Sequence, residues 1–495
     1  MRKQKQMCMA WLALLGCVAM LTSCGGQTNS ADENDSADQG TTAAAESDTQ
    51  VETEEETEYD RLKELGEYTG EKETFKILDA NDYPALHVNY SSGELTGDAL
   101  NDALYNREQA MEERYGVKIE YTTAGGSVAD GMNLIRNAVA AGDTPYDLCI
   151  SALMSGGIGS AALEGLFADM KESSSLSLTA PWWSKLVYEN FLLNDKLLFS
   201  TGDFASTVYQ QPSAMILNSD LLEDNGITTD FYQTVRDGKW TLDLVNSTFV
   251  PLNNDLNGDG VMDVENDYFG LIYQKNDLGC NALLIGAGAS IVTIEDGKLT
   301  LALNNEKTVN LVEKLHSLTC DIQYTEQNDI YNKAFVENRA VAMIHLISTA
   351  QRDALCDMES DYMVMPMPKA DEAQESYRSL LNPWSAAYVA IPMNADVESS
   401  GFLAEAMAYY AYENIRPEIY EKILKAKTLR DAGSSEMLDI VFDTICLDFG
   451  TIHDFGGVQS VCTSAVYYGT PFVSALEACT SAAESELEDY MENWQ

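Results

Sequence analysis

The stretch "TFKILDA", residues 74–80, alternates apolar and polar side chains and opens the pattern that decides the fold. Alternation of this kind predicts a half-buried β-strand. Residues 98–116 then repeat apolar side chains at steps of three and four, which predicts an amphipathic helix that ends at a glycine. The order recurs, with a strand over 117–123, a helix over 127–143 and a strand over 146–151. Strands and helices that alternate over short connections predict an α/β fold with a parallel sheet covered by helices.

The loop after the third strand, "ALMSGGIGS" (152–160), is the first candidate for ligand binding. In an open parallel sheet, the loops at the carboxyl ends of the strands line the ligand crevice. We therefore expect ligand contacts from Ser151, Met154 and Ser155. The glycines of this loop lack both the P-loop lysine and the dinucleotide spacing, so they do not predict a phosphate site.

The second half of the chain indicates two lobes rather than one. Two late apolar segments, 362–368 and 385–392, predict strands, and the chain beyond Phe402 is almost wholly helical. A single strand-helix-strand domain does not require so late a pair of strands followed by a helical cap. Chain crossings between two lobes near residues 210, 347 and 395 would account for this order.

The N-terminus has the features of an export signal. A cationic start precedes an apolar run, Met7 to Leu21, which is shorter than the ~20 residues of a membrane-spanning helix. Residues 21–24 (Leu-Thr-Ser-Cys) resemble the bacterial lipobox, in which the cysteine carries the lipid. We expect a signal peptide over 1–23, lipidation at Cys24, and a protein anchored to the outer face of the cytoplasmic membrane of a Gram-positive bacterium. An ordinary secretory signal and a short membrane anchor are the alternatives.

Acidic residues dominate the segment that follows and the chain as a whole. Residues 25–60 contain twelve Asp or Glu and no Lys or Arg, so they cannot bury enough apolar surface to offset chain entropy. We expect a disordered acidic stalk over 24–72. The net charge of −49 repels nucleic acid and anionic lipid headgroups, so neither is an expected partner.

The cysteines argue against a disulfide scaffold, and the missing catalytic motifs argue against an enzyme. Beyond residue 24 the chain has seven cysteines, an odd number without a Cys-x-x-Cys pair, which favours buried thiols over a disulfide scaffold and leaves any pairing open. Metalloprotease and serine-hydrolase motifs are missing from the sequence, so we do not expect an enzyme. Paired carboxylates for glycoside hydrolysis leave no signature in sequence, so a surface glycan-active enzyme remains an alternative, as does an adhesion module.

Several motifs, in their order along the chain, resemble the extracellular solute-binding lipoproteins (family 1) of ABC uptake transporters, which mostly serve sugars. The resemblance is carried by "AAGDTPYDL" (140–148), "NDKLLFSTGD" (194–203), "MILNSDLLEDNGI" (215–227), "FVENRAVAMI" (335–344) and "PWSAAYVAIP" (383–392). It implies a two-lobe periplasmic-binding-protein-like (type II) fold with a hinge and a helical C-terminal part. Lobe 1 would contain 73–210 and 348–395, and lobe 2 would contain 211–347 and 396–495.

The resemblance also implies a function. A carbohydrate, expected to be an oligosaccharide, would bind between the lobes of a monomer, stabilise the closed form and be delivered to the ABC permease subunits.

Sugar recognition needs flat apolar faces and fixed polar groups, so residues near strand ends and crossings are the best candidates. Trp384 precedes a crossover strand, and Gln211 lies where the chains of such proteins pass between lobes. Trp182 is a further candidate, although a large aromatic residue on an apolar helix face is usually part of the core. The remaining candidates follow predicted strands and are Asp79, Asn81, Ser348 and Thr349.

The loop "DLNGDGVMDVEND" (255–267) has the ligand spacing of an EF-hand around Gly260. Position twelve is Asn266 instead of glutamate, so Glu265 or Asp267 would have to complete the shell. A strand rather than a second helix follows, which favours a structural calcium clip over a calcium sensor. A metal-free Asp/Asn/Gly turn is the alternative. The expected ligands are Asp255, Asn257, Asp259, the Val261 carbonyl, Asp263 and Glu265.

Overall fold

The computed structural model describes residues 60–80, 91, 93–154, 156–295, 297–319, 330–350, 355, 358–419 and 432–493. Residues from Tyr59 to the C-terminus form one compact unit, to which all elements below belong. The expected lipidation site Cys24, the acidic segment up to residue 59, and the candidates Asn81 and Ser155 lie outside the described residues. Within the described ranges, no helix combines the length and apolar character needed to cross a membrane.

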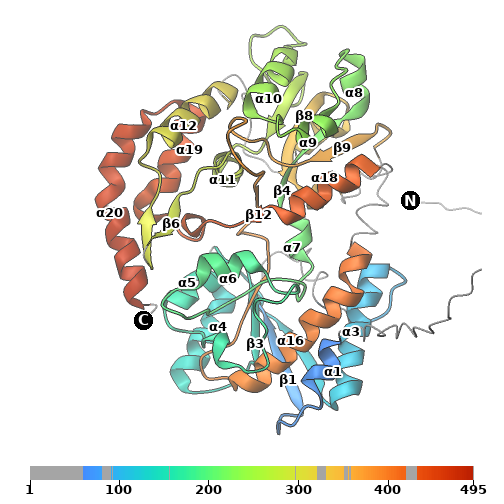
Figure 1. The fold of residues 1–495 in the computed structure, drawn as a ribbon, viewed down its shortest axis with the longest axis vertical. Helices are drawn as coiled ribbons and strands as arrows, with labels where there is room; N and C mark the ends of the chain where they lie inside the picture. The colour runs from blue at the N-terminus through green and yellow to red at the C-terminus, as the bar shows by residue number, and fades with distance from the viewer. Residues whose placement is uncertain are drawn as a thin grey trace, which may run out of the picture. The chain divides into compact units, whose positions relative to one another are not determined.

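The first sheet has the strand order β11-β3-β1-β2, and its strands β1 and β3 are labelled in Figure 1. Its first three strands in sequence run parallel, as predicted from residues 74–151, and the late strand β11 pairs antiparallel with β3. Side-chain caps fix the connecting helices, because Asp98 accepts the backbone N–H of Asn101 and Ser127 forms a capping box with Asp130. The elements are β1 (Thr74–Asp79), α3 (Ala99–Tyr115), β2 (Lys118–Thr123), α4 (Val128–Ala141), β3 (Leu148–Ser151) and β11 (Tyr388–Ala390).

Two helices pack on this first lobe from parts of the chain predicted to lie elsewhere. Helix α1 (Arg61–Leu65) is fixed by Arg61, which donates to Glu405 Oε1 over 2.8 Å and to the Ser175 carbonyl over 2.8 Å. Glu405 belongs to α16 (Val397–Asn414), which contacts α1 and α3. The prediction of a disordered stalk through residue 72 is therefore wrong from residue 60 onward. The assignment of residues 397–414 to the second lobe is also wrong.

The second sheet has the order β5-β8-β4-β9. Strands β5 and β8 are parallel, and β4 runs antiparallel to both β8 and β9. Because β9 pairs with β4, residues 362–365 belong to the second lobe and not, as predicted, to the first. These strands are β4 (Ser213–Asn218), β5 (Phe269–Tyr273), β8 (Ala340–Leu346) and β9 (Tyr362–Met365).

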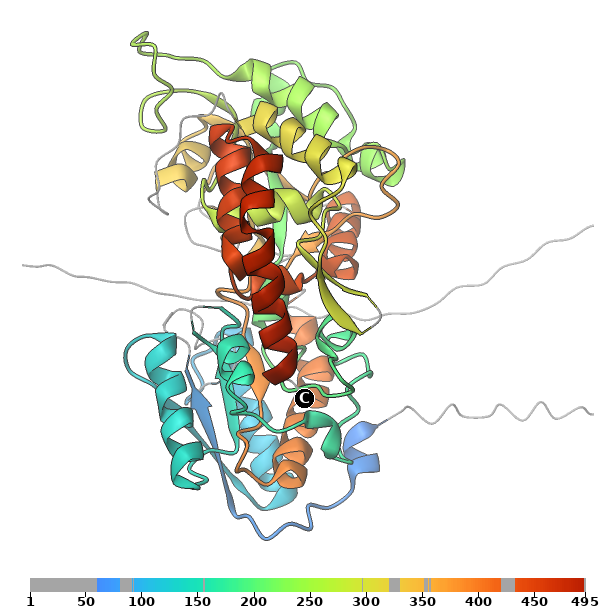
Figure 2. The ribbon, with the colours of Figure 1, turned by 90° about the vertical axis from the view of Figure 1, so that its left-hand side faces the viewer.

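Helices enclose the second sheet, and α19 and α20 lie side by side in both views (Figures 1 and 2). Trp240 is fully buried between Phe231 and Phe249, and its indole N–H donates to the Pro366 carbonyl over 2.8 Å. The helices are α8 (Ser219–Asp224), α9 (Phe231–Arg236), α10 (Leu242–Phe249), α11 (Asp277–Gly286), α12 (Glu306–Thr319), α13 (Ile330–Val336), α14 (Ile347–Ala350), α18 (Ala432–Asp443), α19 (Val458–Tyr468) and α20 (Phe472–Asn493). A small hairpin joins β6 (Val292–Glu295) to β7 (Lys298–Leu301).

The chain passes from one sheet to the other through short segments. The first passage runs through α7 (Thr207–Gln210) into β4. The second leads from β10 (Ser379–Leu380), which pairs with β12 (Ile445–Cys446), to β11. Pro212 and Leu381 form a bridge, so these two passages lie against each other. The next described elements after β8, α14 and β9, both contact strands of the second sheet, so the passage predicted near residue 347 is wrong.

Five cysteines lie among the described residues, and none of the five forms a disulfide. Cys149, Cys280, Cys446 and Cys462 are buried, and burial raises the pKa of each thiol. Buried thiols with raised pKa values behave as small apolar side chains. This agrees with the interpretation favoured from the sequence.

Candidate functional site

The carboxyl edge of the first sheet is ordered by buried polar side chains. Asp79 ends β1 and Ser151 ends β3, and they are only 2% and 0% exposed. The Ser151 hydroxyl donates to the Ala80 carbonyl over 3.1 Å. Both predicted residues thus lie at the expected edge. Ser151 orders the backbone there and does not present its hydroxyl at the surface, so its expected direct contact is corrected.

The loop after β3 is tied to the segment that precedes β11. The backbone N–H groups of Leu153 and Met154 both donate to the Pro383 carbonyl, over 3.1 and 3.2 Å. Trp384 comes next in the chain and is 48% exposed, although it is a large aromatic residue. Its backbone N–H donates to Asn382 Oδ1 over 2.9 Å, which fixes the start of this turn. The structure thus brings Met154 and Trp384, predicted from separate motifs, to one edge.

Gln211 lies at the centre of a hydrogen-bonded knot that joins the two passages, which we call the crossing knot (Gln211, Asn382 and Ser385). The Ser385 hydroxyl donates to Gln211 Oε1 over 2.6 Å, and Asn382 Nδ2 donates to the Ser385 hydroxyl over 2.7 Å. The Asn382 backbone N–H donates to the Gln211 carbonyl over 3.0 Å. Gln211 is 3% exposed, so it supports the site from beneath. Sequence reasoning found Gln211 and missed its partners, which only the paired passages bring together.

A small pocket of about 20 Å³ opens at the edge of the second sheet where β5 and β8 end and β4 begins. Ser213, at the start of β4, is two residues beyond Gln211, so the crossing knot connects the pocket to the Trp384 turn. Apolar and polar atoms mix in the wall, as in sites that orient a small polar ligand. The pocket is lined by Ser213, Gln274, Leu278, Gly279, Ala282, Ile344, His345 and Leu346.

The candidates after β8 lie beside this pocket but are largely covered. The Thr349 hydroxyl bonds His345 Nδ1, and Thr349 is fully buried. Thr349 therefore orients the imidazole of a pocket residue and does not reach a ligand itself, which corrects its predicted contact. The Ser348 hydroxyl oxygen is buried and has no hydrogen-bond partner among the described residues.

A tyrosine pair at the end of α19 lies against the loop that leads from β5 to α11, and the sequence analysis missed it. The ring of Tyr467 stacks on Tyr273 at 5.7 Å, and its hydroxyl reaches the carbonyls of Gln274 and Asn276. Tyr468 is 66% exposed, and the Lys275 ammonium lies 4.7 Å from the centre of its ring. The only signal for this pair in the sequence was "YYG" at the end of a helix. The residues that the two tyrosines contact lie almost two hundred positions earlier in the chain.

Trp182 is a core residue, and its predicted role as a sugar platform is corrected. It is 3% exposed, and its ring meets Tyr409 of α16 edge-to-face at 5.0 Å. The neighbouring Trp183 is equally buried and donates its indole N–H to Glu405 Oε2 over 2.7 Å. The alternative weighed from the sequence, packing in the core, accounts for both residues, although they lie just before α6 (Lys185–Phe191) and not on a helix face.

The loop predicted to bind calcium is a series of side-chain-to-backbone turns. The Asp255 carboxylate accepts the backbone N–H groups of Gly258 (2.6 Å) and Gly260 (2.7 Å), and the Gly260 bond contributes most to lowering the pKa of Asp255. Both glycines have positive φ, near 73° and 82°, which their lack of a Cβ allows. Asp259 accepts the backbone N–H of Val261 in the same way.

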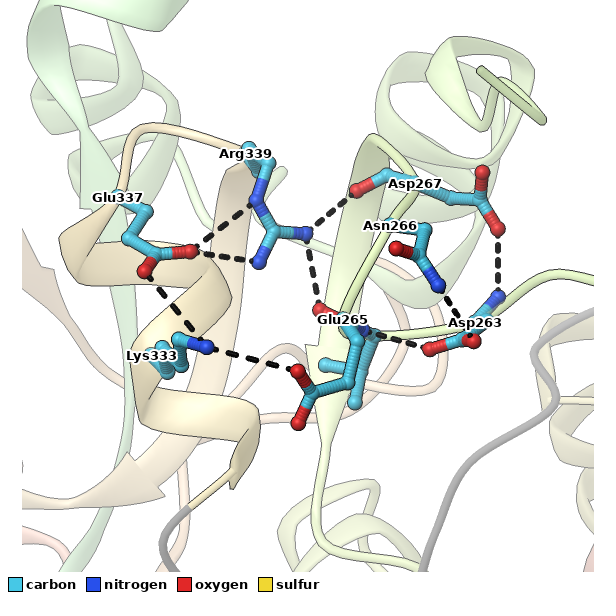
Figure 3. A network of polar contacts seen from close by, with 8 residues as sticks. Asp263, Glu265, Asn266, Asp267, Lys333, Glu337 and Arg339 are labelled. Carbon is cyan, nitrogen blue, oxygen red and sulfur yellow. Dashed lines mark hydrogen bonds and ion pairs between the residues drawn. The ribbon is translucent and has the colours of Figure 1, made fainter. Parts of the chain in front are cut away.

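The second half of this loop is fixed to the turn between α13 and β8 by a polar network (Figure 3). Arg339 Nη1 donates to the carbonyls of Val264 (2.8 Å) and Asp267 (2.9 Å), and Lys333 pairs with Glu265 at 3.5 Å. The predicted ligand Glu265 therefore faces a cation, which corrects that assignment. Nowhere in the described ranges do three His, Cys, Asp or Glu side chains gather in a way that would hold a metal.

The two sheets, with paired chain passages between them, define the periplasmic-binding-protein-like class of α/β folds, and solved structures agree. A cyclo/maltodextrin-binding protein complexed with maltotetraose aligns at a TM-score of 0.58 with 12% identity, over 84% of this chain and 98% of that one. An ABC substrate-binding protein from Listeria monocytogenes in complex with cycloalternan aligns at 0.52 with 15% identity, over 84% and 99%. MalX from Streptococcus pneumoniae in complex with maltopentaose aligns at 0.51 with 15% identity, over 83% and 100%.

No protein-family model matches the chain, and no curated protein matches it by sequence. At 12 to 15% identity, the likeness to these structures establishes the fold.

Proposed function

We propose that this chain is the substrate-binding protein of an ABC uptake transporter and captures an oligosaccharide between its two lobes. The observation that carries the proposal is the exposed indole of Trp384 on the crossing knot, which connects it to a small pocket of mixed polar and apolar lining. Three solved structures of this fold are complexes with an oligosaccharide, which supports the ligand class. An exposed indole stacks on the CH face of a pyranose, while pocket side chains can take its hydroxyls.

Ligand contacts with both lobes would link sugar binding to delivery. A ligand stabilises a closed form only through contacts that both lobes make with it at the same time. Trp384 precedes a strand of the first sheet, whereas Gln274 follows β5 and His345 lies near the end of β8 in the second. A sugar that touched both sets would therefore favour the closed form over the open one. The permease would then recognise the closed form, and no covalent step is required.

The proposal also includes the lipid anchor to the membrane and the protein partners. The lipobox-like residues 21–24 support lipidation of Cys24 and a position at the outer face of the cytoplasmic membrane. The partners would be the permease subunits, and the chain would act as a monomer. Mass spectrometry of the mature N-terminus, before and after mild base treatment, tests the lipid anchor because base releases ester-linked acyl chains.

Calcium binding at residues 255–263 is a second part of the proposal, supported by the chemistry of the loop. Hard oxygen donors recur at alternate positions around two glycines of positive φ, which is the chain path that calcium loops use. The donors would be Asp255, Asn257, Asp259, the Val261 carbonyl and Asp263, without Glu265. The ion would stiffen a loop that Arg339 already anchors at its other end.

Binding assays against sugar panels separate this function from its alternatives. A transport protein should bind a small oligosaccharide saturably and return it unchanged. A surface glycan-active enzyme would release shorter products, and an adhesion module would show no saturation by a small sugar. Isothermal titration followed by chromatography of the titrated sugar distinguishes all three.

A further inference from the structure

Lys275 lies in the loop between β5 and α11, and this loop and this helix both contribute to the wall of the pocket in the second lobe. Lys275 follows the pocket residue Gln274 directly and precedes the pocket residue Leu278. Its ammonium lies over two tyrosine rings of α19, 4.7 Å from the centre of Tyr468 and 5.8 Å from that of Tyr467. A cation and an exposed aromatic face are thus presented together beside the pocket.

The backbone around Lys275 is fixed on both sides. The Tyr467 hydroxyl reaches the carbonyls of Gln274 (3.3 Å) and Asn276 (3.2 Å). Asn276 caps α11 by accepting the Gly279 backbone N–H over 3.0 Å. A Cβ at Gly279 would lie 1.9 Å from the Gln274 carbonyl oxygen, so the loop requires glycine there. Lys275 therefore projects from a loop whose path is set by its neighbours.

Lys275 has no carboxylate partner among the described residues, although the chain carries 79 acidic and 30 basic residues. The acid nearest in sequence, Asp277, accepts the Thr463 hydroxyl over 2.6 Å. Other lysines of this lobe are paired, such as Lys314 with Asp243 and Lys333 with Glu265. Burial lowers the pKa of Lys275, so part of its hydration shell has been removed without a counter-charge.

We propose that Lys275 and Tyr468 form a subsite for a negatively charged sugar unit, so that the captured oligosaccharide is acidic. This inference rests on the proposed function. The Tyr468 ring would stack on the pyranose, and the ammonium would pair with its anionic group. A neutral sugar would bury the same ammonium further without a partner, which is unfavourable. The charge could be a uronate carboxylate or a sulfate ester, which share this chemistry.

The test compares each acidic oligosaccharide with a neutral counterpart of the same length by isothermal titration of the full mature chain. Tri- to pentasaccharides of galacturonate are paired with their methyl esters, sulfated galactans with desulfated ones, and maltotetraose is added as a further neutral sugar. We expect the acidic member of one pair to bind at least ten-fold tighter than its neutral partner. Which pair shows the difference identifies uronate or sulfate as the source of the charge.

Substitutions at Lys275 and at a control lysine test whether the preference for the acidic sugar depends on Lys275. Lys275→Gln should abolish the preference for the acidic sugar, Lys275→Arg should keep most of it, and Lys307→Gln, an exposed lysine of α12, should change nothing. The comparison of acid and ester in the unsubstituted chain needs no variant, so a misfolded protein does not affect it. Equal or tighter saturable binding of the neutral sugars, or a preference that survives Lys275→Gln, overturns this inference and leaves the proposed function standing. Failure of every acidic and neutral sugar to saturate the chain overturns both.

Discussion

Ser385 donates its hydroxyl hydrogen to the side-chain oxygen of Gln211 over 2.6 Å, across 174 residues of sequence. One residue belongs to the passage that enters β4 and the other to the passage that enters β11. Both passages are thereby held in one position relative to each other, and the exposed Trp384 is carried between them. The candidate site therefore depends on a contact that is remote in sequence.

Ser385→Ala should destabilise the protein, because the buried Gln211 amide then loses its partner. A buried polar group left unsatisfied costs about 1–3 kcal/mol, which urea unfolding followed by circular dichroism can measure. Ser474→Ala, an exposed serine near the start of α20, is the control and should change the free energy of unfolding by less than about 0.5 kcal/mol. Equal effects of the two substitutions would contradict the structural role assigned to the crossing knot.

Trp384→Ala should weaken oligosaccharide binding roughly ten-fold or more and leave the melting temperature nearly unchanged, because the indole is half exposed and its loss removes a stacking face. Titration calorimetry and thermal unfolding give the two readouts. Met393→Ala removes another exposed apolar side chain (45%) and should leave the affinity as it was. If Trp384→Ala instead lowers stability while affinity holds, the indole is structural.

Asp203 should make stability depend on pH. Burial raises the pKa of Asp203 from 3.8 to about 7, although Tyr209 donates a hydrogen bond to it and Arg416 lies near. Between about pH 4 and 7 the folded chain then binds a proton that the unfolded chain has lost. Its contribution therefore favours folding below this window and is lost as the pH rises through it.

Asp203→Asn keeps an acceptor for Tyr209 and removes the titration. The variant should gain stability relative to the original chain at pH 8 and gain little at pH 4.5. The gain is at most about 4 kcal/mol, since one pKa unit corresponds to ~1.4 kcal/mol. Urea unfolding across this range, with Glu372→Gln as an exposed control, measures it. A difference that does not vary with pH would show that Asp203 is not the titrating group.

Calcium should raise the melting temperature by preferential binding to the folded chain, and a chelator should reverse the shift. The loop geometry adds a sharper expectation for two acids. Asp259→Asn should abolish most of the shift, whereas Glu265→Gln should keep it, because the Glu265 carboxylate pairs with Lys333. If neither calcium nor the chelator changes the melting temperature, the loop is a metal-free turn.

Local pattern was enough to predict the parallel strands of the first sheet, because a helix lies between each strand and the next in sequence, and the period and caps of each helix lie within twenty residues. The lobe boundaries could not be predicted in this way. The segment at 362–365 is apolar and would suit either sheet, and only its pairing with β4 decides its place. Helix α16 likewise belongs to the first lobe because of contacts such as Arg61 with Glu405, separated by 344 residues.

The candidate site could be predicted only in part, because only some of its residues have a local signature in the sequence. Gln211, Met154 and Trp384 follow from strand ends and passages, which are visible in sequence. Trp182 and Trp384 are the same residue type after a proline, but one is covered by Tyr409 and the other is not. Lys275 and Tyr468 have no local signature, since their meeting depends on the packing of α19 against the end of β5.

The most direct test of the central claim is calorimetric titration of the mature chain with tri- to pentasaccharides, acidic and neutral, with chromatography of the sugar afterwards. The proposed function predicts saturable binding of one oligosaccharide per chain and recovery of that sugar intact. Shortened products after incubation, or heats that never saturate with any sugar of this size, would contradict it.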